Sequence, residues 1–300
     1  MRRRSVRLGI PIALLLLAVM YVSISYLMAS GVTKAERKAL ETSPASYGLE
    51  FEDVEFSPRN GDLTLSGWYI EGEAGQPTII FVHGLNRNRE SSLELASKLA
   101  GRDYSILLFD LRGHGPSGGE KISGGYHERR DVLGAFDYLV QRGVQAEKVG
   151  VLGFSMGAAA ALLGVAEEPQ IRAVVADSSY ANISDLIAQE TARETPFPEW
   201  MVPVFVPGMD LMAGLFFDID IGAMVPQDAV ARLDYPVLLI HGTADERIPV
   251  DSSVRIHLAS PPGSSLWRVD GVGHTDAFDE HPDEYVERVA AYFESRLGGE

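Results

Sequence analysis

Short apolar runs alternate with longer amphipathic segments along the chain from residue 78 to the C-terminus. The short runs are rich in Val, Ile and Leu, as is typical of strands that are buried on both faces of a sheet. The longer segments have the length and the apolar spacing of helices. The pattern predicts strands over residues 78–82, 105–109, 149–153, 173–176, 237–240 and 266–269, and helices over residues 91–101, 127–141, 155–168, 252–259 and 283–297.

This alternation predicts an α/β fold, in which a mostly parallel central sheet is covered by helices on both faces. Before it, residues 51–57 and 63–70 are predicted to form an antiparallel hairpin, because the turn signal Arg59-Asn60-Gly61-Asp62 separates them. In parallel sheets of this kind, ligands bind beyond the carboxyl ends of the strands. We therefore expect the chemistry of the protein in the loops that follow the strands.

One interval, at about residues 180–232, breaks the alternation. It has no strand pattern, but it contains a long apolar segment with several prolines over residues 196–217. Such a segment is too long for a simple loop and predicts a helical cap that is inserted over the strand ends. A further core layer without a functional role is the alternative, and the side of the cap that faces away is available to lipid. We expect the underside of the cap to shape an apolar substrate pocket through Phe197, Trp200, Met201, Phe205 and Met209.

The N-terminal segment differs in kind from the rest of the chain. A basic stretch, residues 1–7, precedes 26 residues without a charge, residues 8–33. A bilayer-spanning helix needs about 20 apolar residues, so residues 8–33 are predicted to be a single-pass anchor. A signal peptide that is cleaved near its small residues is the alternative, and it would release a secreted protein. Residues 34–48 are expected to be a linker and residues 49–300 the α/β domain.

The distribution of charge bears on location and partners. Four arginines precede the predicted span and three basic residues follow it closely, which favours a cytoplasmic N-terminus and an extracytoplasmic domain. Residues 43–300 carry 19 basic and 40 acidic side chains, so nucleic acid is not expected as a partner. The chain has no cysteine, which excludes disulfides and thiolate metal sites. No metal or other cofactor is expected, and the sequence does not indicate an oligomeric state.

A candidate nucleophile lies in the stretch VGVLGFSMGAAAALLG, residues 149–164. A G-x-S-x-G match alone is weak, but here a buried strand precedes Ser155 and an alanine-rich helix follows it. A strand-to-helix turn this tight strains the serine backbone and brings helix and strands close together. Gly153 and Gly157 have no Cβ to clash there. The start of the helix also favours negative charge, which suits a reacting serine oxygen.

A serine hydroxyl needs a base that accepts its proton near neutral pH. Among the seven histidines, His274 follows the last predicted strand in a short glycine-flanked loop, GVGHTDAF, from which its ring can reach Ser155. His281 is the alternative. His83 is interpreted as a residue that shapes its loop and not as a proton carrier.

The imidazole in turn needs a carboxylate that fixes its tautomer. Asp245 in HGTADERIP follows a predicted strand, and Ser155, Asp245 and His274 stand in the chain order expected of a nucleophile-elbow enzyme. Asp177 is the runner-up, and Asp276 is expected to cap the last helical region.

Negative charge on the carbonyl oxygen of a tetrahedral intermediate requires hydrogen-bond donors. The N–H of Met156, directly after the serine, is one predicted donor of this oxyanion hole. The second is predicted to be the N–H of Leu85, which follows Gly84 in the loop FVHGLNRN after the strand at residues 78–82.

Five motifs in register resemble those of the α/β-hydrolase superfamily, and particularly its membrane-anchored serine esterase-like branch related to monoacylglycerol lipases. They are FVHGLNRNR, FDLRGHGPSGG at residues 109–119, GFSMG, LLIHGTADERIPV and GVGHT. The resemblance implies the α/β-hydrolase fold and makes residues 110–115, DLRGHG, a structural loop near the pocket. A serine at the elbow argues against epoxide hydrolases and dehalogenases, which use an aspartate there.

Three functions are compatible with these residues. The first is hydrolysis of carboxylic esters, with lipid-like or acylated substrates, through an acyl-enzyme on Ser155. The second is an aminopeptidase or amidase, which needs an acidic pocket residue for the substrate amine. The third is an inactive, membrane-tethered binding protein. The cap offers four acidic candidates for the second function: Glu190, Glu194, Glu199 and Asp210.

Overall fold

The computed structural model describes residues 2–34, 36–102 and 104–298. Two compact units divide the chain: a helical unit, Met1–Lys34 with Ser184–Ala223, and a sheet unit, Ala35–Ile183 with Met224–Glu300. Most of the expected linker thus belongs to the sheet unit, and the inserted helices occupy a shorter interval than residues 180–232. The first residue of the predicted basic segment and the last two of the predicted α/β domain lie outside the described residues.

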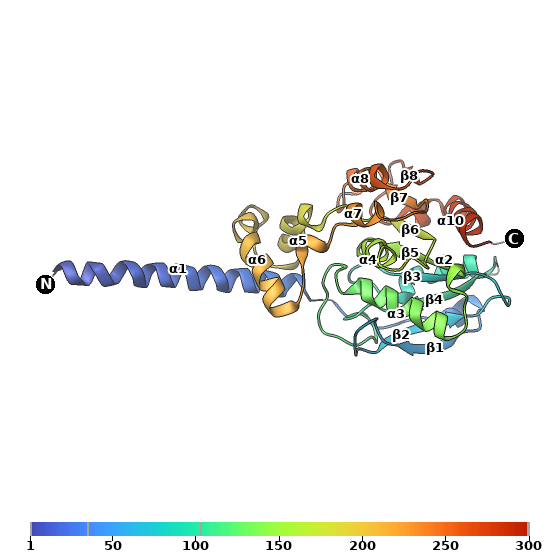
Figure 1. Ribbon diagram of the computed structural model, residues 1–300, viewed down its shortest axis with the longest axis horizontal. Helices are drawn as coiled ribbons and strands as arrows, with labels where there is room; N and C mark the ends of the chain where they lie inside the picture. The colour runs from blue at the N-terminus through green and yellow to red at the C-terminus, as the bar shows by residue number, and fades with distance from the viewer. Residues whose placement is uncertain (1, 35, 103, 299–300) are drawn as a thin grey trace. The chain divides into compact units, whose positions relative to one another are not determined.

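The sheet unit is built on a single eight-stranded sheet in the order β1-β2-β4-β3-β5-β6-β7-β8 (Figure 1). The pairs β1–β2 and β2–β4 are antiparallel, and all other pairs are parallel. The predicted fold class is confirmed, and each observed strand begins and ends within two residues of its predicted bounds. The strands are β1 (Glu52–Phe56), β2 (Leu65–Ile70), β3 (Thr78–Val82), β4 (Ser105–Phe109), β5 (Val149–Phe154), β6 (Val174–Asp177), β7 (Leu238–Gly242) and β8 (Ser265–Val269).

Helices cover both faces of this sheet. One face packs against α3 (Glu128–Gln141), α4 (Met156–Val165), α7 (Pro226–Val230) and α8 (Asp251–Ala259). The other packs against α2 (Leu93–Ala100), α9 (Ala277–Glu280) and α10 (Pro282–Leu297). The 3₁₀ helices of the unit are Pro44–Tyr47, Arg89–Ser92 and Ala146–Lys148.

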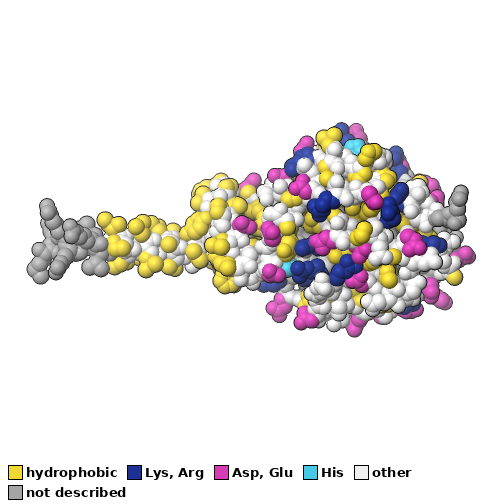
Figure 2. Space-filling view, in the orientation of Figure 1, with side chains coloured by type: hydrophobic (Ala, Val, Ile, Leu, Met, Phe, Trp, Pro, Cys, Tyr) yellow, Lys and Arg dark blue, Asp and Glu magenta, His cyan; other side chains and the backbone are white. Residues whose placement is uncertain are grey.

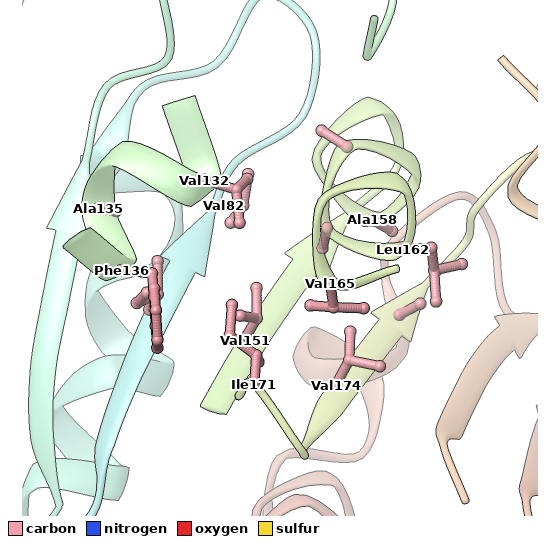
Figure 3. Packing of buried hydrophobic residues seen from close by; sticks show 14 of the residues in the cluster. Val82, Val132, Ala135, Phe136, Val151, Ala158, Leu162, Val165, Ile171 and Val174 are labelled. Atoms are coloured by element: carbon pink, nitrogen blue, oxygen red, sulfur yellow. The ribbon is translucent and has the colours of Figure 1, made fainter. Parts of the chain in front are cut away.

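Neighbouring residues of the central strands pack into apolar clusters on opposite faces of the sheet. Ile80 and Val82 of β3 belong to the cluster under α3 and α4, whereas Ile79 and Phe81 belong to the cluster on the other face. Figure 3 shows the first cluster, in which side chains of α3 and α4 meet those of β3, β5 and β6. Since both faces are buried, the central strands carry uninterrupted apolar residues, which is the pattern that predicted them.

Helix α4 differs from its prediction at both ends. It ends at Val165 and not at residue 168, because Glu167 and Glu168 donate to Gly164 and Val165 in tight turns ahead of Pro169. It begins at Met156, because Ser155 has a backbone conformation that no helix contains.

The helical unit contains α1 (Arg2–Val32), α5 (Ile187–Glu194) and α6 (Val202–Phe217), with 3₁₀ helices at Glu199–Met201 and Ile221–Ala223. A further 3₁₀ helix, Ile183–Asp185, begins at the last residue of the sheet unit before the insertion. The interval without a strand pattern is therefore helical, as predicted. A separate apolar cluster forms its core, to which α1 contributes Met28 and Ala29 and α6 contributes Val202, Phe205, Met209 and Met212. Two segments of the described residues, Ile10–Val32 and Glu199–Phe217, are long and apolar enough to cross a membrane.

Candidate active site

Ser155 occupies a strained turn between β5 and α4. Its backbone has φ 53° and ψ −119°, a combination that is costly for a residue with a side chain. A Cβ at Gly153 would lie 2.7 Å from the Ala158 Cα, and one at Gly157 would lie 2.8 Å from the Val82 carbonyl carbon. Only glycine fits at either position, which is the close approach that the sequence predicted. The turn holds the serine at the carboxyl end of β5, where a ligand of a parallel sheet binds.

The structure brings Ser155, His274 and Asp245 together from three different loops. His274 Nε2 lies 2.8 Å from Ser155 Oγ, and His274 Nδ1 lies 2.6 Å from Asp245 Oδ2. Since a carboxylate only accepts, Nδ1–H donates to Asp245, which leaves the Nε2 lone pair to accept from the serine hydroxyl. This chain of hydrogen bonds has the geometry of a nucleophile, a base and an orienting acid.

Asp245 is held as a carboxylate. Burial alone would raise its pKa, but hydrogen bonds from His241 and His274 and from the Ile248 N–H outweigh burial and bring the pKa well below its usual range. The backbone N–H groups of Arg247 and Ile248 donate to Oδ1 at 2.9 and 2.8 Å. Oδ2 is therefore the oxygen that faces His274, and the carboxyl group is ionised near neutral pH.

His241 is a positioning residue that the sequence reasoning missed. It lies in β7, fully buried, with Nε2 2.8 Å from the Ile248 carbonyl oxygen and 3.1 Å from Asp245 Oδ2. Its Nδ1 is 2.6 Å from Ser253 Oγ. A carbonyl only accepts, so Nε2 carries the proton and also faces the carboxylate. A histidine four residues before a candidate acid, at the end of a buried strand, was the available signal.

The alternative acid and base have other partners. Asp177 accepts from Ser178 Oγ at 2.8 Å and from the Tyr285 hydroxyl at 2.9 Å, and burial raises its pKa to about 6. His281 stands at the start of α10, where its ring contacts Trp267 edge-on. Asp276 takes the N-cap position of α9, but its side chain makes no capping hydrogen bond.

The loop of the second predicted oxyanion donor lies close to the nucleophile. A Cβ at Gly84 would be 3.3 Å from the Ser155 Cβ, so the backbone that leads to Leu85 passes beside the serine. Met156 begins α4, and the first N–H groups of a helix have no partner within the helix. Both predicted donors therefore lie in backbone that borders Ser155.

Two histidines hold that loop in shape. His83 donates from Nδ1 to the Gly84 carbonyl oxygen at 2.8 Å and accepts from the Leu111 N–H at Nε2, at 3.0 Å. Burial, with His114 nearby, lowers the pKa of His83 to about 3, so the ring is neutral near pH 7. This agrees with the interpretation of His83 as a residue that shapes its loop. The ring of His114 accepts from the Asn86 N–H at 3.2 Å. Through these hydrogen bonds, the motif at residues 110–115 helps to hold the loop that carries Leu85.

The segment that follows α1 also holds this loop. The Glu36 N–H donates to Asn86 Oδ1 at 2.9 Å, and Glu41 and Thr42 donate to the carboxylate of Glu90. Arg37 donates to three carbonyl oxygens at residues 115–119. Residues 36–42 therefore lie along the loop that carries Leu85 and do not form a free linker.

A cavity of about 370 Å³ opens at Ser155 and His274. Its lining combines apolar side chains with many charged ones, and it belongs to the sheet unit: Tyr47, Leu85, Leu95, Phe154, Phe278, Arg87, Glu90, Glu94, Arg247, Asp276 and Asp279. None of the five predicted cap residues is among its described lining residues. Within the described residues, no cluster of three acidic or histidine side chains is arranged to hold a metal ion.

The five cap residues lie in the helical unit, and four of them pack against its apolar cluster. Phe205 and Met209 are buried against α1, and Phe197 and Met201 pack at the edge of the same cluster. Trp200 is 78% exposed. Four of these side chains thus pack within the helical unit, around α6 and α1, which the sequence pattern could not foresee. Their role in a substrate pocket stays a prediction.

Comparison with known proteins agrees with this architecture. A model of the alpha/beta hydrolase family matches residues 79–288. The uncharacterized protein YfhR of Escherichia coli K12 is 30% identical over 257 residues, which cover 82% of this chain and 81% of YfhR. Esterase Pf2001 of Pyrococcus furiosus has a TM-score of 0.72 and 25% identity, covering 88% of this chain and 99% of its own.

A peptidase shares the fold. The acylaminoacyl peptidase of Pyrococcus horikoshii has a TM-score of 0.58 at 21% identity, over 83% of this chain and 42% of its own. The family model covers more than two thirds of the chain, and YfhR is similar to it over four fifths of both sequences. The chain belongs to the alpha/beta hydrolase family.

Proposed function

We propose that this protein is a serine hydrolase that cleaves carboxylic esters through an acyl-enzyme. The observation that carries the proposal is the chain of hydrogen bonds from Ser155 Oγ through His274 to Asp245. Esterase Pf2001, which matches nearly end to end, supports ester cleavage over other reactions of the fold.

The reaction follows from the geometry. Ser155 Oγ attacks the ester carbonyl carbon while its proton passes to His274 Nε2, and Asp245 stabilises the resulting imidazolium. The N–H groups of Met156 and Leu85 hold the oxyanion of the tetrahedral intermediate. When the intermediate collapses, the bond to the alcohol oxygen breaks and His274 returns the proton to that oxygen. Water then attacks the acyl-enzyme, gives its proton to His274, and releases the acid as Ser155 recovers its proton.

The cavity indicates what kind of ester fits. At about 370 Å³ it is at the small end of the range for small-molecule sites, which is about 300–1,000 Å³. Leu85, Leu95 and Phe154 offer apolar surface for an acyl group, whereas the charged lining residues Arg87, Glu94, Asp276 and Asp279 suit the polar remainder of the substrate. We therefore propose an acylated compound with a short acyl group as substrate, in preference to a long-chain lipid.

An amidase or aminopeptidase is the second candidate, and one feature favours it. Glu94, Asp276 and Asp279 line the cavity, and burial together with Asp276 and Glu94 raises the pKa of Asp279. Carboxylates that crowd one another in this way would gain from a cationic substrate group. These residues of the sheet unit are candidates to hold a substrate amine, beside the four acidic residues of the cap.

The test pairs one variant with two substrate series. Ser155→Ala should abolish hydrolysis of p-nitrophenyl esters and labelling by a fluorophosphonate probe, while circular dichroism shows an unchanged fold. Esters graded in acyl length should show highest kcat/KM for short chains. Matched aminoacyl amides and esters separate the two candidate functions. Wild-type protein that is folded but neither labels nor turns over any of these substrates would instead be a binding protein.

We also propose that α1 anchors the protein in a membrane as a single span, with the sheet unit on the extracytoplasmic side. The four arginines before the apolar stretch and its length support this orientation. The resemblance to membrane-anchored serine esterases agrees with it. Recovery of the full-length chain in carbonate-washed membranes, with a C-terminal tag accessible from outside the cell, is expected. A shortened chain in the medium would support signal cleavage instead.

A further inference from the structure

The outward face of α6 is apolar to a degree that is unusual in water. Asp210 is the one charged residue within its sixteen residues. One side of α6 is buried in the core of the helical unit, whereas large apolar side chains on the other side are exposed. The exposed fractions are 63% for Val204, 56% for Leu211, 67% for Leu215, 62% for Phe216 and 78% for Trp200 in the preceding 3₁₀ turn. A contiguous face of this kind marks a surface that meets an apolar partner.

The same helix is packed on the anchor. Tyr21 stacks on Phe205 with ring centroids 5.1 Å apart and donates its hydroxyl to the Val204 carbonyl oxygen at 3.2 Å. A Cβ at Gly208 would overlap with Ser25, so α1 and α6 are in close contact there. Residues 10–20 of α1, in contrast, are exposed on every side. Figure 2 shows hydrophobic side chains along α1 and over the helices that pack on it.

The length of α1 determines where α6 lies if α1 spans a bilayer. The hydrocarbon core is about 30 Å thick, and a helix rises about 1.5 Å per residue. The uncharged stretch begins at residue 8 and α6 first touches α1 at Tyr21, so about 20 Å of helix precede the contact. The remaining 10 Å or so of the core must be crossed by the part of α1 that α6 covers. Helix α6 is thereby placed at the depth of the acyl chains and headgroups.

The order of the strands excludes that α6 crosses the membrane in addition to α1. The inserted helices leave the sheet unit after β6 and return before β7, and these two strands are hydrogen-bonded parallel neighbours. A single crossing by α6 would place β6 and β7 on opposite sides of the membrane. The other α-helix of the insertion, α5, has only eight residues, which is too few for a return span. Helix α6 therefore enters and leaves on one side.

We propose that α6 is an in-plane membrane helix, embedded beside the end of α1 in the leaflet nearest the sheet unit, with Val204, Leu211, Leu215 and Phe216 in contact with lipid. This inference rests on the proposed anchoring by α1. An interfacial helix of this type buries its apolar face about 5–10 Å below the headgroups. The other face of α6 is buried against α1. A helix that is apolar on nearly all sides is thereby kept from water although it does not cross the membrane.

The absence of cysteine from the sequence makes a direct test simple. Single Leu→Cys variants at Leu211 and Leu215 are spin-labelled in the full-length protein and reconstituted in phosphatidylcholine–phosphatidylglycerol nanodiscs. Leu16→Cys is the lipid-exposed control on α1, and Leu258→Cys, at an 80% exposed leucine of the sheet unit, is the water-exposed control. Accessibility to dissolved oxygen is then compared with accessibility to a water-soluble nickel chelate by power saturation.

We expect Leu211→Cys and Leu215→Cys to favour oxygen over nickel, as Leu16→Cys does, at a shallower depth. Values like those of Leu258→Cys at both positions, with Leu16→Cys still in lipid, would overturn the inference and leave the anchor intact. If Leu16→Cys itself is exposed to nickel, the anchoring proposal fails. Trp200 gives an independent reading without a label: brominated lipid should quench the part of the emission that Trp200→Phe removes.

Discussion

Gly157→Ala tests the closest backbone approach in the active site. A Cβ there would lie 2.8 Å from the Val82 carbonyl carbon and nearer still to the carbonyl oxygens of Val82 and His83. Contacts of real Cβ atoms are unstrained from 3.4 Å. Since every opposing atom is backbone, no side chain can move aside. Packed interiors have no spare volume to absorb the overlap. The first turn of α4 must therefore move away from the end of β3 by roughly 0.6 Å or more, the difference between 2.8 and 3.4 Å.

The separation acts on stability and on the oxyanion hole together. Overpacking of this kind costs about 1–3 kcal/mol, and for a domain of this size each kcal/mol lowers Tm by about 2–4 °C. The two predicted donors, the N–H groups of Met156 and Leu85, belong to the two segments that are forced apart. The loss of one such donor typically lowers kcat by about 10²-fold to 10³-fold. We expect kcat/KM for a short p-nitrophenyl ester to fall by about 10²-fold.

Thermal unfolding by circular dichroism and ester hydrolysis below the transition measure the two effects separately. Gly101→Ala is the matched control, because this glycine at the end of α2 has φ −65° and its nearest neighbour to a Cβ is 3.5 Å away. The control should match wild type in both measurements. If Gly157→Ala retains wild-type kcat/KM and Tm, the elbow is not as tightly packed as this geometry requires, and the reasoning is refuted.

Three further substitutions test other parts of the site. Asp245→Asn should lower kcat by about 10⁴-fold, because its oxygen stays with two backbone N–H groups and its NH₂ faces His274 Nδ1, imposing the wrong tautomer; wild-type kcat would contradict this. Asn86→Gly can keep the φ of 55° but loses the hydrogen bond from the Glu36 N–H. We expect kcat to fall with KM unchanged, and the fall should be smaller than the about 10²-fold loss that a 1 Å misplacement causes. Burial raises the pKa of Asp177 from 3.8 to about 6. Between these two pH values the carboxyl group is protonated in the folded protein and ionised in the unfolded chain. Its contribution to stability is thus greatest below pH 3.8 and falls as pH rises to about 6. In Asp177→Asn, Tm measured from pH 4 to 6 should decline less, or rise more, than in wild type, and parallel curves would exclude the assignment.

The residues of the site were predictable because they follow strands. Ser155 comes directly after β5, whereas Asp245 and His274 lie in the loops that follow β7 and β8. Parallel strands carry such loops to one edge of the sheet. Apolar runs located the strands to within two residues, since both faces of the sheet are buried. The distances between the three side chains could not be read from the pattern, although their chain order could.

Contacts made through packing or through a second hydrogen bond could not be read from the sequence pattern. His241 appears as one polar residue in a buried strand, and only the structure shows that its ring faces Asp245 and Ser253. Phe205 and Met209 have the composition of a pocket wall, yet they are buried against α1. The periodicity and composition of apolar residues predict that a side chain is buried. They do not predict which distant helix buries it, because that depends on how the helices cross.

The loop of Leu85 shows how the site depends on segments far away in sequence. Its neighbour Asn86 is held with φ 55° by two bonds, since its N–H donates to His114 and its side chain accepts from Glu36. A residue with a side chain keeps such a φ only where its surroundings compensate the strain. The bond from Glu36 comes from the segment that directly follows α1, so the chain that leaves the proposed anchor also fixes the backbone of a proposed oxyanion donor. The proposed anchor and the proposed oxyanion hole are therefore linked by one segment. Changes in residues 36–42 should alter turnover although none of these residues lines the cavity.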